Sequence, residues 1–330
     1  MKTKAILLLP AWSRDRIYGP EGIAEISQLV DVTDCAELLD TLYALRPVLQ
    51  DAEVILSGWG MVTMDADFLD AAPRLRAVMY GAGSVRYFLT DDFWKRDILL
   101  TSAWAANAIP VIEYTIAAIT FGLKKVLLAA DMTRRDKTFK APSGTTGLHG
   151  ARVGVIGAGM VGAGVLQRLK AYEVETFCYD PYLCSHRARE LWTTPMGLEE
   201  VFRSCDVVSL HAASIPATEH MITGAHLRSM KEGAVFINTA RGRIVSEDEI
   251  IEVLRQGKIF AFIDVTDPEP PESGSPLYTL PNVLLTPHLA GPQGAEVRRN
   301  GQYVIEELKR YLAGEEPRYP VTREMMEWMA

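Results

Sequence analysis

Three polar residues that could move a proton onto a ketone each follow a predicted strand. Arg241, Glu269 and His288 come shortly after the apolar runs 235–238, 260–265 and 283–286. Hydride transfer to a 2-keto acid needs a cation to hold the carboxylate, a proton donor for the nascent alkoxide, and a group that keeps the donor protonated. Arginine binds carboxylate with a charged, planar fork, histidine exchanges protons near neutral pH, and a neighbouring carboxylate favours the imidazolium. We therefore predict Arg241 as substrate clamp, His288 as acid and base, and Glu269 as its partner.

Each of these residues also has a purely structural interpretation. Arg241 could form a salt bridge at a strand end, Glu269 could be a solvated acid in the loop DPEPPES, and His288 could be a hydrogen-bonded structural histidine. His211, at a further strand end, competes as proton donor, with Glu219 as the acid available to it. The strands of a parallel sheet present their carboxyl ends at one edge, and this convergence favours the catalytic interpretation.

A glycine-rich turn separates an apolar run, residues 153–156, from a helical pattern. Its six residues, Gly157 to Gly162, read G-A-G-M-V-G. The first glycine permits a tight turn, Gly159 lets a pyrophosphate approach the backbone, and the last glycine lets helix and strand pack closely. The helix start at Met160 and Val161 offers N–H groups to the phosphates. The pattern predicts a dinucleotide site, against the alternative of a glycine turn chosen for packing alone.

Asp180 follows the next predicted strand, residues 175–179. A carboxylate in this place accepts hydrogen bonds from a ribose diol and repels a 2′-phosphate, so we predict NAD rather than NADP. His211, Thr239 and Ala240 follow other strands that end at the same edge, and we expect them to line the cofactor site. The predicted cofactor is NAD, and the sequence shows no metal-ligand spacing.

Predicted strands alternate with helical patterns along both halves of the 330-residue chain, a length that suits two domains. We expect an α/β fold with two Rossmann-like, doubly wound parallel sheets. The predicted strands of the first half are residues 4–9, 30–32, 54–56, 75–80 and 98–101. Predicted helices include residues 21–29, 36–45 (ended by Pro47), 111–134 (opened by Pro110) and 295–312. The loops at the strand ends of the first half, including 10–14, 57–60 and 81–86, face the ligand.

Bulk properties exclude several classes of protein. A net charge of −8 argues against nucleic acid or an anionic membrane as partner. The four cysteines lack a C-x-x-C motif and suggest reduced thiols in a cytoplasmic protein. The apolar N-terminal run continues into charged residues, which favours a core strand over a signal peptide. Charged residues within the apolar stretch 111–130 argue against a membrane span.

The chain resembles the D-isomer-specific 2-hydroxyacid dehydrogenase family. The residues that carry the resemblance are the glycine turn with Asp180 and the segments MKEGAVFINTARGRIV, FIDVTDPEP and PNVLLTPHLAG. The resemblance covers about residues 147–291 closely and the N-terminal part more loosely. It implies Arg241, Glu269 and His288 as the catalytic set, in agreement with the residue types.

The resemblance has further implications for the site and the domains. It implies that Asp264 contacts the nicotinamide carboxamide and that N–H groups around Ala82 and Gly83 receive the substrate carboxylate. It implies a discontinuous, flavodoxin-like substrate-binding domain of residues 1–102 plus 290–330 and an NAD-binding Rossmann domain of residues 103–289. It also implies a homodimer formed through the cofactor domain, which the apolar helix after Pro110 would suit.

Several residues depart from the family pattern. Val85 stands where an Asp is usual, Ala213 and Ile215 replace a Pro and a Thr, and Ser246 and Pro292 replace further common residues. These departures indicate a divergent branch with its own small-molecule 2-keto or 2-hydroxy acid, whose identity and direction of turnover the sequence leaves open. Trp59 and Trp104 near the predicted active-site loops suit a bulky or apolar substrate, although packing at a domain hinge is the alternative.

Two other functions fit the same motifs. An NAD(H)-sensing, corepressor-like binding protein would share the fold, but we expect it to carry a further tail. A formate-type dehydrogenase would pair its histidine with a neutral glutamine, so Glu269 argues against it, although not against a phosphite-type enzyme.

Overall fold

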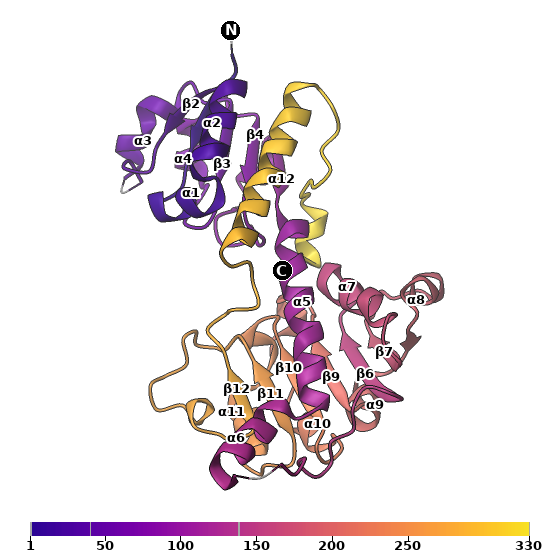
Figure 1. The fold of residues 1–330 in the computed structure, drawn as a ribbon. Coiled ribbons are helices and arrows are strands. Elements are labelled where there is room, and N and C mark those ends of the chain that lie inside the picture. Colours follow the sequence, from indigo (N-terminus) through magenta and orange to yellow (C-terminus); the bar gives the residue numbers. More distant parts are fainter. Residues whose placement is uncertain (1, 40, 138, 330) are drawn as a thin grey trace. The chain divides into compact units, whose positions relative to one another are not determined.

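The computed structural model describes residues 2–39, 41–137 and 139–329, and the chain divides into two compact units. Unit 1 comprises Met1–Ala108 and Pro292–Ala330, and unit 2 comprises Ile109–Gly291. Each unit is a parallel β-sheet flanked by helices (Figure 1). This confirms the predicted α/β class with two parallel sheets, and unit 1 is built from two separate pieces of chain.

The sheet of unit 1 has five parallel strands in the order β2-β1-β3-β4-β5, which is the flavodoxin-like order. Residues of β1, β3 and β4 are buried almost throughout, as expected for strands covered on both faces. The strands are β1 Lys4–Leu7, β2 Asp31–Asp34, β3 Val54–Ser57, β4 Ala77–Tyr80 and β5 Leu99–Ser102. The helices are α1 Ala11–Ile17, α2 Gly19–Leu29, α3 Leu42–Leu49, α4 Ala66–Ala71 and α12 Ala295–Leu312.

Helix α12 belongs to the core of unit 1 although it comes last in the chain. Its apolar stripe, which includes Val297, Val304, Ile305 and Leu308, packs with residues of β1, β3 and β4 in one buried cluster. The spacing of three and four residues places these side chains on one face of the helix. The remaining C-terminal chain forms a bridge between Pro320 and Thr101 beside β5 and ends in a short 3-10 turn, η5 Glu324–Glu327.

The sheet of unit 2 has seven parallel strands in the order β12-β11-β10-β9-β6-β7-β8. The order reverses between β6 and β9, and such a switch point opens a crevice beyond the strand ends. The strands are β6 Ala151–Ile156, β7 Val174–Tyr179, β8 Thr194–Pro195, β9 Val207–Leu210, β10 Val235–Asn238, β11 Phe260–Ile263 and β12 Val283–Leu285. The helices are α5 Trp104–Leu123 (its first turn in unit 1), α6 Val126–Asp136, α7 Met160–Leu169, α8 Ser185–Leu191, α9 Leu198–Ser204, α10 Gly224–Arg228 and α11 Glu247–Leu254.

Two expected helices and one expected loop are wrong. The single helix expected over residues 111–134 begins earlier, at Trp104, contains Pro110 and breaks at Lys125, whose φ of 50° is left-handed. Pro47 does not end a helix but lies inside α3, whose N-cap Thr41 accepts a hydrogen bond from the Ala44 N–H. The expected loop 10–14 forms most of α1, which Pro10 precedes.

Helix α5 is long and apolar enough to cross a membrane by length and composition alone, with a mean hydropathy of 1.4. Within that segment 56% is buried inside the structure, and core helices of soluble proteins pass the same test. Among the described residues, no group of three or more His, Cys, Asp or Glu side chains could hold a metal ion.

Candidate active site

The strand register of unit 2 aligns the residues that follow six strands. Ile263, Asn238, Leu210 and Ile156 are level with one another across β11, β10, β9 and β6, and Leu285 and Tyr179 extend the row to both sides. The next residue on each strand therefore lies along one edge of the sheet. Those residues are Thr286, Asp264, Thr239, His211, Gly157 and Asp180.

The turn after β6 fits a dinucleotide. Gly157 has φ 91°, and a Cβ on it would lie 2.7–2.8 Å from backbone atoms of the loop after β9. A Cβ on Gly162 would overlap the carbonyl oxygen of Gly157, so helix α7 can approach β6 only through this glycine. Gly159 caps α7 and faces open space, which leaves room for a phosphate at the N–H groups of Met160 and Val161.

Asp180 holds this turn in place through both of its carboxylate oxygens. Its Oδ2 accepts a hydrogen bond from the Ala158 N–H at 2.7 Å, and its Oδ1 accepts one from the Tyr182 N–H at 2.7 Å. Each carboxylate oxygen has a further lone pair for a ribose hydroxyl. One side chain therefore sets the shape of the turn and places a negative charge beside it.

We expect Asp180→Asn to weaken NADH binding by about 10-fold and to improve the affinity ratio of NADPH to NADH. The substitution removes the charge that repels a 2′-phosphate, and a hydrogen bond to a charged group contributes about 1.5–3 kcal/mol. Fluorescence titration of both cofactors measures the two dissociation constants. An unchanged ratio would contradict the role of Asp180.

The loop after β10 presents Arg241. Asn238, which is fully buried, accepts a hydrogen bond from the Ala240 N–H at 3.1 Å and donates one to the Arg241 carbonyl at 3.2 Å. A Cβ on Gly242 would overlap the backbone of Thr266, so this glycine lets the loop lie against the one after β11. The guanidinium donates to the Ala240 carbonyl at 2.6 Å and is otherwise positioned by the turn.

Asp264 fixes the loop that carries His288. Its carboxylate, 2% exposed, accepts hydrogen bonds from the Thr286 hydroxyl at 2.6 Å and from the N–H groups of Leu289 and Ala290 at 2.7 and 2.9 Å. The Thr286 hydroxyl also lies 3.0 Å from that of Tyr114 on α5. These bonds surround His288, whose φ of 53° is left-handed, a conformation that needs support from its surroundings. This bracing role of Asp264 was not foreseen from the sequence, because the bonds link residues 22–26 positions apart.

Glu269 and His288 form a hydrogen-bonded pair in unit 2. The Glu269 Oε1 lies 2.7 Å from Nδ1 of His288, and both side chains are a little over two-fifths exposed. Because Glu269 occupies Nδ1, Nε2 is the ring nitrogen that remains available to a ligand. Burial lowers the pKa of Arg241, and the nearby charge of Glu269 opposes that shift. The structure thus brings the arginine, the glutamate and the histidine into one electrostatic neighbourhood.

His211 is an unsuitable proton donor in this site. Its Nε2 lies 2.8 Å from the Ser209 hydroxyl, and burial lowers the pKa of His211 to about 3. A group with this pKa is neutral at physiological pH and has no proton to give as an acid. Its place beside Gly157 instead suits the lining of a cofactor crevice. The hydroxyl of Thr239, at the next strand end, lies 3.4 Å from that of Thr115.

The expected substrate loops lie in unit 1. The Ser102 hydroxyl bonds to the carbonyls of Ala82 and Gly83 at 2.7 Å each, and the N–H groups of these two residues have no acceptor among the described residues. Trp59 is half-buried after β3, and Trp104 packs edge-to-face on Tyr319 at 5.9 Å. Free N–H groups in succession suit an anion such as a carboxylate.

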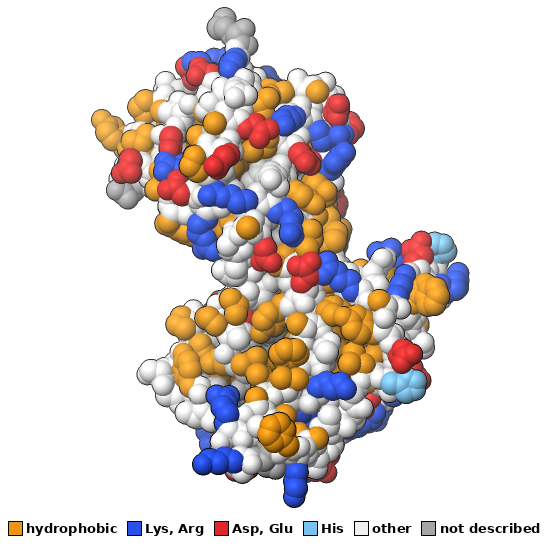
Figure 2. Space-filling model, viewed as in Figure 1, with side chains coloured by type: hydrophobic (Ala, Val, Ile, Leu, Met, Phe, Trp, Pro, Cys, Tyr) orange, Lys and Arg blue, Asp and Glu red, His pale blue; other side chains and the backbone are white. Residues whose placement is uncertain are grey.

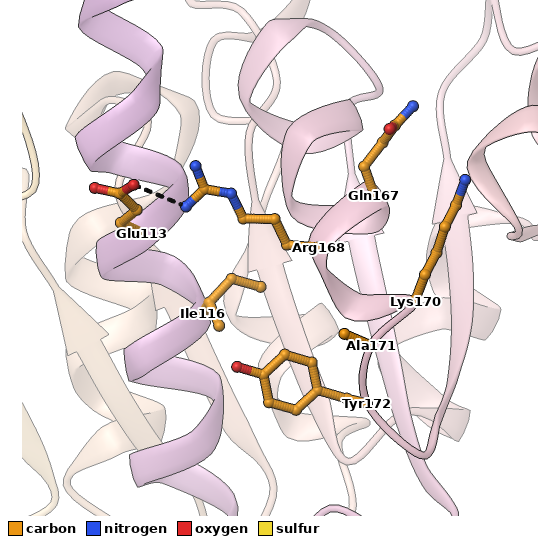
Figure 3. A pocket seen from close by; sticks show the side chains of 7 residues that line it. All are labelled: Glu113, Ile116, Gln167, Arg168, Lys170, Ala171 and Tyr172. Atoms are coloured by element: carbon orange, nitrogen blue, oxygen red, sulfur yellow. Dashed lines mark ion pairs between the residues drawn. The ribbon is translucent and has the colours of Figure 1, made fainter.

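A surface hollow of unit 2 lies elsewhere. Its volume is about 680 Å³, and it opens between α5 and the C-terminal end of α7 (Figure 3). Glu113 and Arg168 form an ion pair of 3.1 Å at its rim, and Tyr172 contributes an aromatic ring. No predicted cofactor or catalytic residue lines this hollow, so it is distinct from the predicted cofactor site.

Comparison with known proteins identifies the fold and the cofactor domain. Residues 116–290 match the model of "D-isomer specific 2-hydroxyacid dehydrogenase, NAD binding domain". The fold is similar to that of a D-lactate dehydrogenase with NAD⁺ from Lactobacillus jensenii, with a TM-score of 0.80 and 20% identity over 97% of this chain and all of that one.

Two relatives show how much of the chain is shared. A glyoxylate reductase of Korarchaeum cryptofilum is 30% identical over 80% of this chain and 81% of its own length. A D-3-phosphoglycerate dehydrogenase of Methanocaldococcus jannaschii is 28% identical over 94% of this chain. The chain spans only 58% of that protein and 48% of a mycobacterial one with the same name.

Proposed function

Because this chain belongs to the D-isomer-specific 2-hydroxyacid dehydrogenase family, we propose that it is an oxidoreductase that interconverts a 2-keto acid and a D-2-hydroxy acid. The cofactor is NAD, which supplies or accepts the hydride when bound. The observation that carries the proposal is the 2.7 Å bond between Glu269 and His288, with Arg241 at the neighbouring strand end.

The side chains of unit 2 have complementary tasks in this reaction. Arg241 binds the substrate carboxylate and polarises the ketone oxygen with a charge that stays on the guanidinium. His288 donates a proton from Nε2 to the nascent alkoxide and takes it back in the reverse direction. Glu269 holds the ring at Nδ1 and stabilises the imidazolium, while Asp264 keeps the loop of His288 in its left-handed conformation.

The cofactor residues follow the strand ends. We infer that the turn Gly157–Gly162 binds the pyrophosphate and that Asp180 binds the adenosine ribose. We also infer that His211, Thr239 and Ala240 line the cofactor site and that Asp264 lies near the nicotinamide carboxamide. In unit 1 we assign the substrate carboxylate to the N–H groups of Ala82 and Gly83, and contacts with its side chain to Trp59 and Trp104.

The partners are proposed to be small molecules and a second copy of the chain, without nucleic acid or membrane. We infer a cytoplasmic location, since all four cysteines are free thiols. Three of them are buried, and burial raises the pKa of the Cys178 thiol to about 12, which makes it a weak nucleophile.

The test is a panel of 2-keto acids with side chains of increasing size, read by NADH consumption. We expect turnover of at least one acid, with a preference for larger side chains than that of glyoxylate because of Trp59 and Trp104. Formate and phosphite are tested as substrates in the same way, to examine the formate- and phosphite-type alternatives. A pull-down for a protein partner that binds only with NADH tests the sensor alternative. If the protein turns over no keto acid and no hydroxy acid but binds such a partner, the enzyme hypothesis is wrong and the protein is an NAD(H) sensor.

We infer that a second copy covers α5 and α6. Phe121 on α5 and Leu127 on α6 are 47% and 44% exposed, and α6 has no buried side chain. Figure 2 shows hydrophobic side chains gathered on the face of unit 2 along which α5 runs. An apolar surface of this kind is typical of an interface between subunits.

We expect Phe121→Glu to convert the homodimer to a monomer, because a charge would be buried in the interface. Light scattering after size-exclusion chromatography measures the mass. Tyr43→Glu, at an 86% exposed position on α3, is the matched control and should remain dimeric. A dimer that persists in Phe121→Glu would place the interface elsewhere.

A further inference from the structure

The hydroxyl of Tyr87 joins two loops of unit 1 that follow neighbouring strands. It lies 3.2 Å from the Met61 N–H and 3.3 Å from the Gly58 carbonyl, both in the loop after β3, where the Met61 N–H also donates to the Gly58 carbonyl at 3.2 Å. Tyr87 itself belongs to the segment after β4, which also contains Ala82 and Gly83. The register pairs Ser57 with Tyr80, so the two loops leave the sheet side by side.

The Tyr80 hydroxyl completes this arrangement. Tyr80 is 1% exposed, its hydroxyl lies 3.0 Å from that of Tyr87, and burial raises its pKa, so it keeps its proton. If Tyr80 and the Met61 N–H donate to the Tyr87 oxygen, Tyr87 can donate to the Gly58 carbonyl. This arrangement satisfies all four groups, and buried polar groups without partners are costly.

The ring of Tyr87 is fixed even though the residue is 51% exposed. It packs edge-to-face on Phe88 at 5.3 Å, and the ring of Tyr80 lies 5.0 Å from the same Phe88. Phe88 is fully buried, as is most of Val85, so the segment after β4 is anchored in the core. Arg86 adds a second anchor because it donates to the carbonyls of Met326 and Met329 near the C-terminal end of the chain.

The loop that Tyr87 holds carries Trp59. A Cβ on Gly58 would overlap Ile17, and Gly60 has φ 88° with Pro10 packed against it, so the backbone on both sides of Trp59 is closely constrained. Trp59 packs on residues of two hydrophobic clusters of unit 1, and the Arg16 guanidinium lies over its ring at 5.6 Å. The indole thus stands on a closely constrained loop to which the tyrosine hydroxyl is bonded.

We propose that Tyr87 is a positioning residue that fixes Trp59 relative to the N–H groups of Ala82 and Gly83 and thereby sets which 2-keto-acid side chains are accepted. The inference rests on the proposed function. The Tyr87 hydroxyl links the loop of Trp59 to the segment of Ala82 and Gly83. When the substrate carboxylate binds the free N–H groups, the distance to the indole therefore limits the size of the substrate side chain.

The test compares Tyr87→Phe with the wild-type chain on pyruvate, 2-ketobutyrate, 2-ketoisocaproate and phenylpyruvate. We expect the ratio of kcat/KM between the best acid and the next smaller one to fall by about 10-fold, mainly through KM, because a loosened pocket discriminates less. The NADH dissociation constant should stay within about two-fold. Tyr43→Phe, a fully comparable change on exposed α3, should leave every value unchanged.

A double-mutant cycle with Trp59→Phe separates positioning from general destabilisation. If Tyr87 acts through Trp59, the double variant should show the selectivity of Trp59→Phe alone, since coupled residues are non-additive. Additive effects, or a selectivity ratio within about two-fold of wild type in Tyr87→Phe, would overturn the proposal.

Hydrogen exchange gives a readout that does not depend on turnover. The Met61 amide loses its bond to Tyr87 in Tyr87→Phe but keeps the one to the Gly58 carbonyl, so it should exchange about 3-fold faster or more there and at the wild-type rate in Tyr43→Phe. Wild-type protein without activity on any keto acid would refute the proposed function and with it the selection of substrate, whereas unchanged exchange at Met61 would refute the positioning by Tyr87 itself.

Discussion

His288→Asn is expected to reduce kcat by about 10²–10⁴-fold while KM for the keto acid changes little, because the variant has no proton to donate to the alkoxide. Asparagine is the suitable replacement, since it tolerates the left-handed backbone that His288 adopts at φ 53°. Stopped-flow measurement of NADH oxidation in a single turnover isolates the chemical step from product release.

The chain offers a matched control for that substitution. His220 has nearly the same φ, 52°, and is an exposed residue in a loop of the same unit. His220→Asn should keep the wild-type rate. Equal rates in both variants would show that another group supplies the proton.

Arg241→Lys is expected to lower kcat/KM by about 10²–10³-fold, through both a lower kcat and a higher KM. Lysine keeps the positive charge but loses the planar fork that binds a carboxylate through two hydrogen bonds and polarises the ketone. Burial makes the loss larger, since the guanidinium is held in a partly desolvated site where its pKa is lowered. Steady-state kinetics with the best acid of the panel measures both constants.

Arg243→Lys is the control for Arg241→Lys. Arg243 lies two residues further along the same loop, but its side chain is exposed and pairs with Glu219 at 2.8 Å. Such surface pairs contribute about 0–1 kcal/mol, so this variant should behave as wild type. Full activity of Arg241→Lys would contradict the proposal that Arg241 binds the substrate.

The parallel direction of the strands and the edge at which they end could be predicted from the sequence because both follow from local patterns. Apolar runs mark β6, β9, β10 and β11, and a parallel sheet places their carboxyl ends together. The glycine turn could also be predicted, because the positions where only glycine fits, Gly157 and Gly162, lie within one short segment.

Contacts between distant residues could not be predicted in this way. The carboxylate of Asp264 bonds to the loop of His288, and the hydroxyl of Tyr87 bonds to the loop of Trp59, only after the sheets have formed. Helix α3 shows that a local signal can also mislead. Pro47 predicts a helix end, but the tertiary packing of Leu45 and Leu49 outweighs the lost backbone hydrogen bond.

The two-piece construction of unit 1 has a consequence for synthesis on the ribosome. Strands β1 to β5 emerge first, but the helix that covers their apolar face, α12, emerges only after the whole of unit 2. Unit 2 can therefore complete its sheet while the nascent chain of unit 1 still exposes hydrophobic side chains. Such exposed surface is where chaperones bind and where aggregation begins.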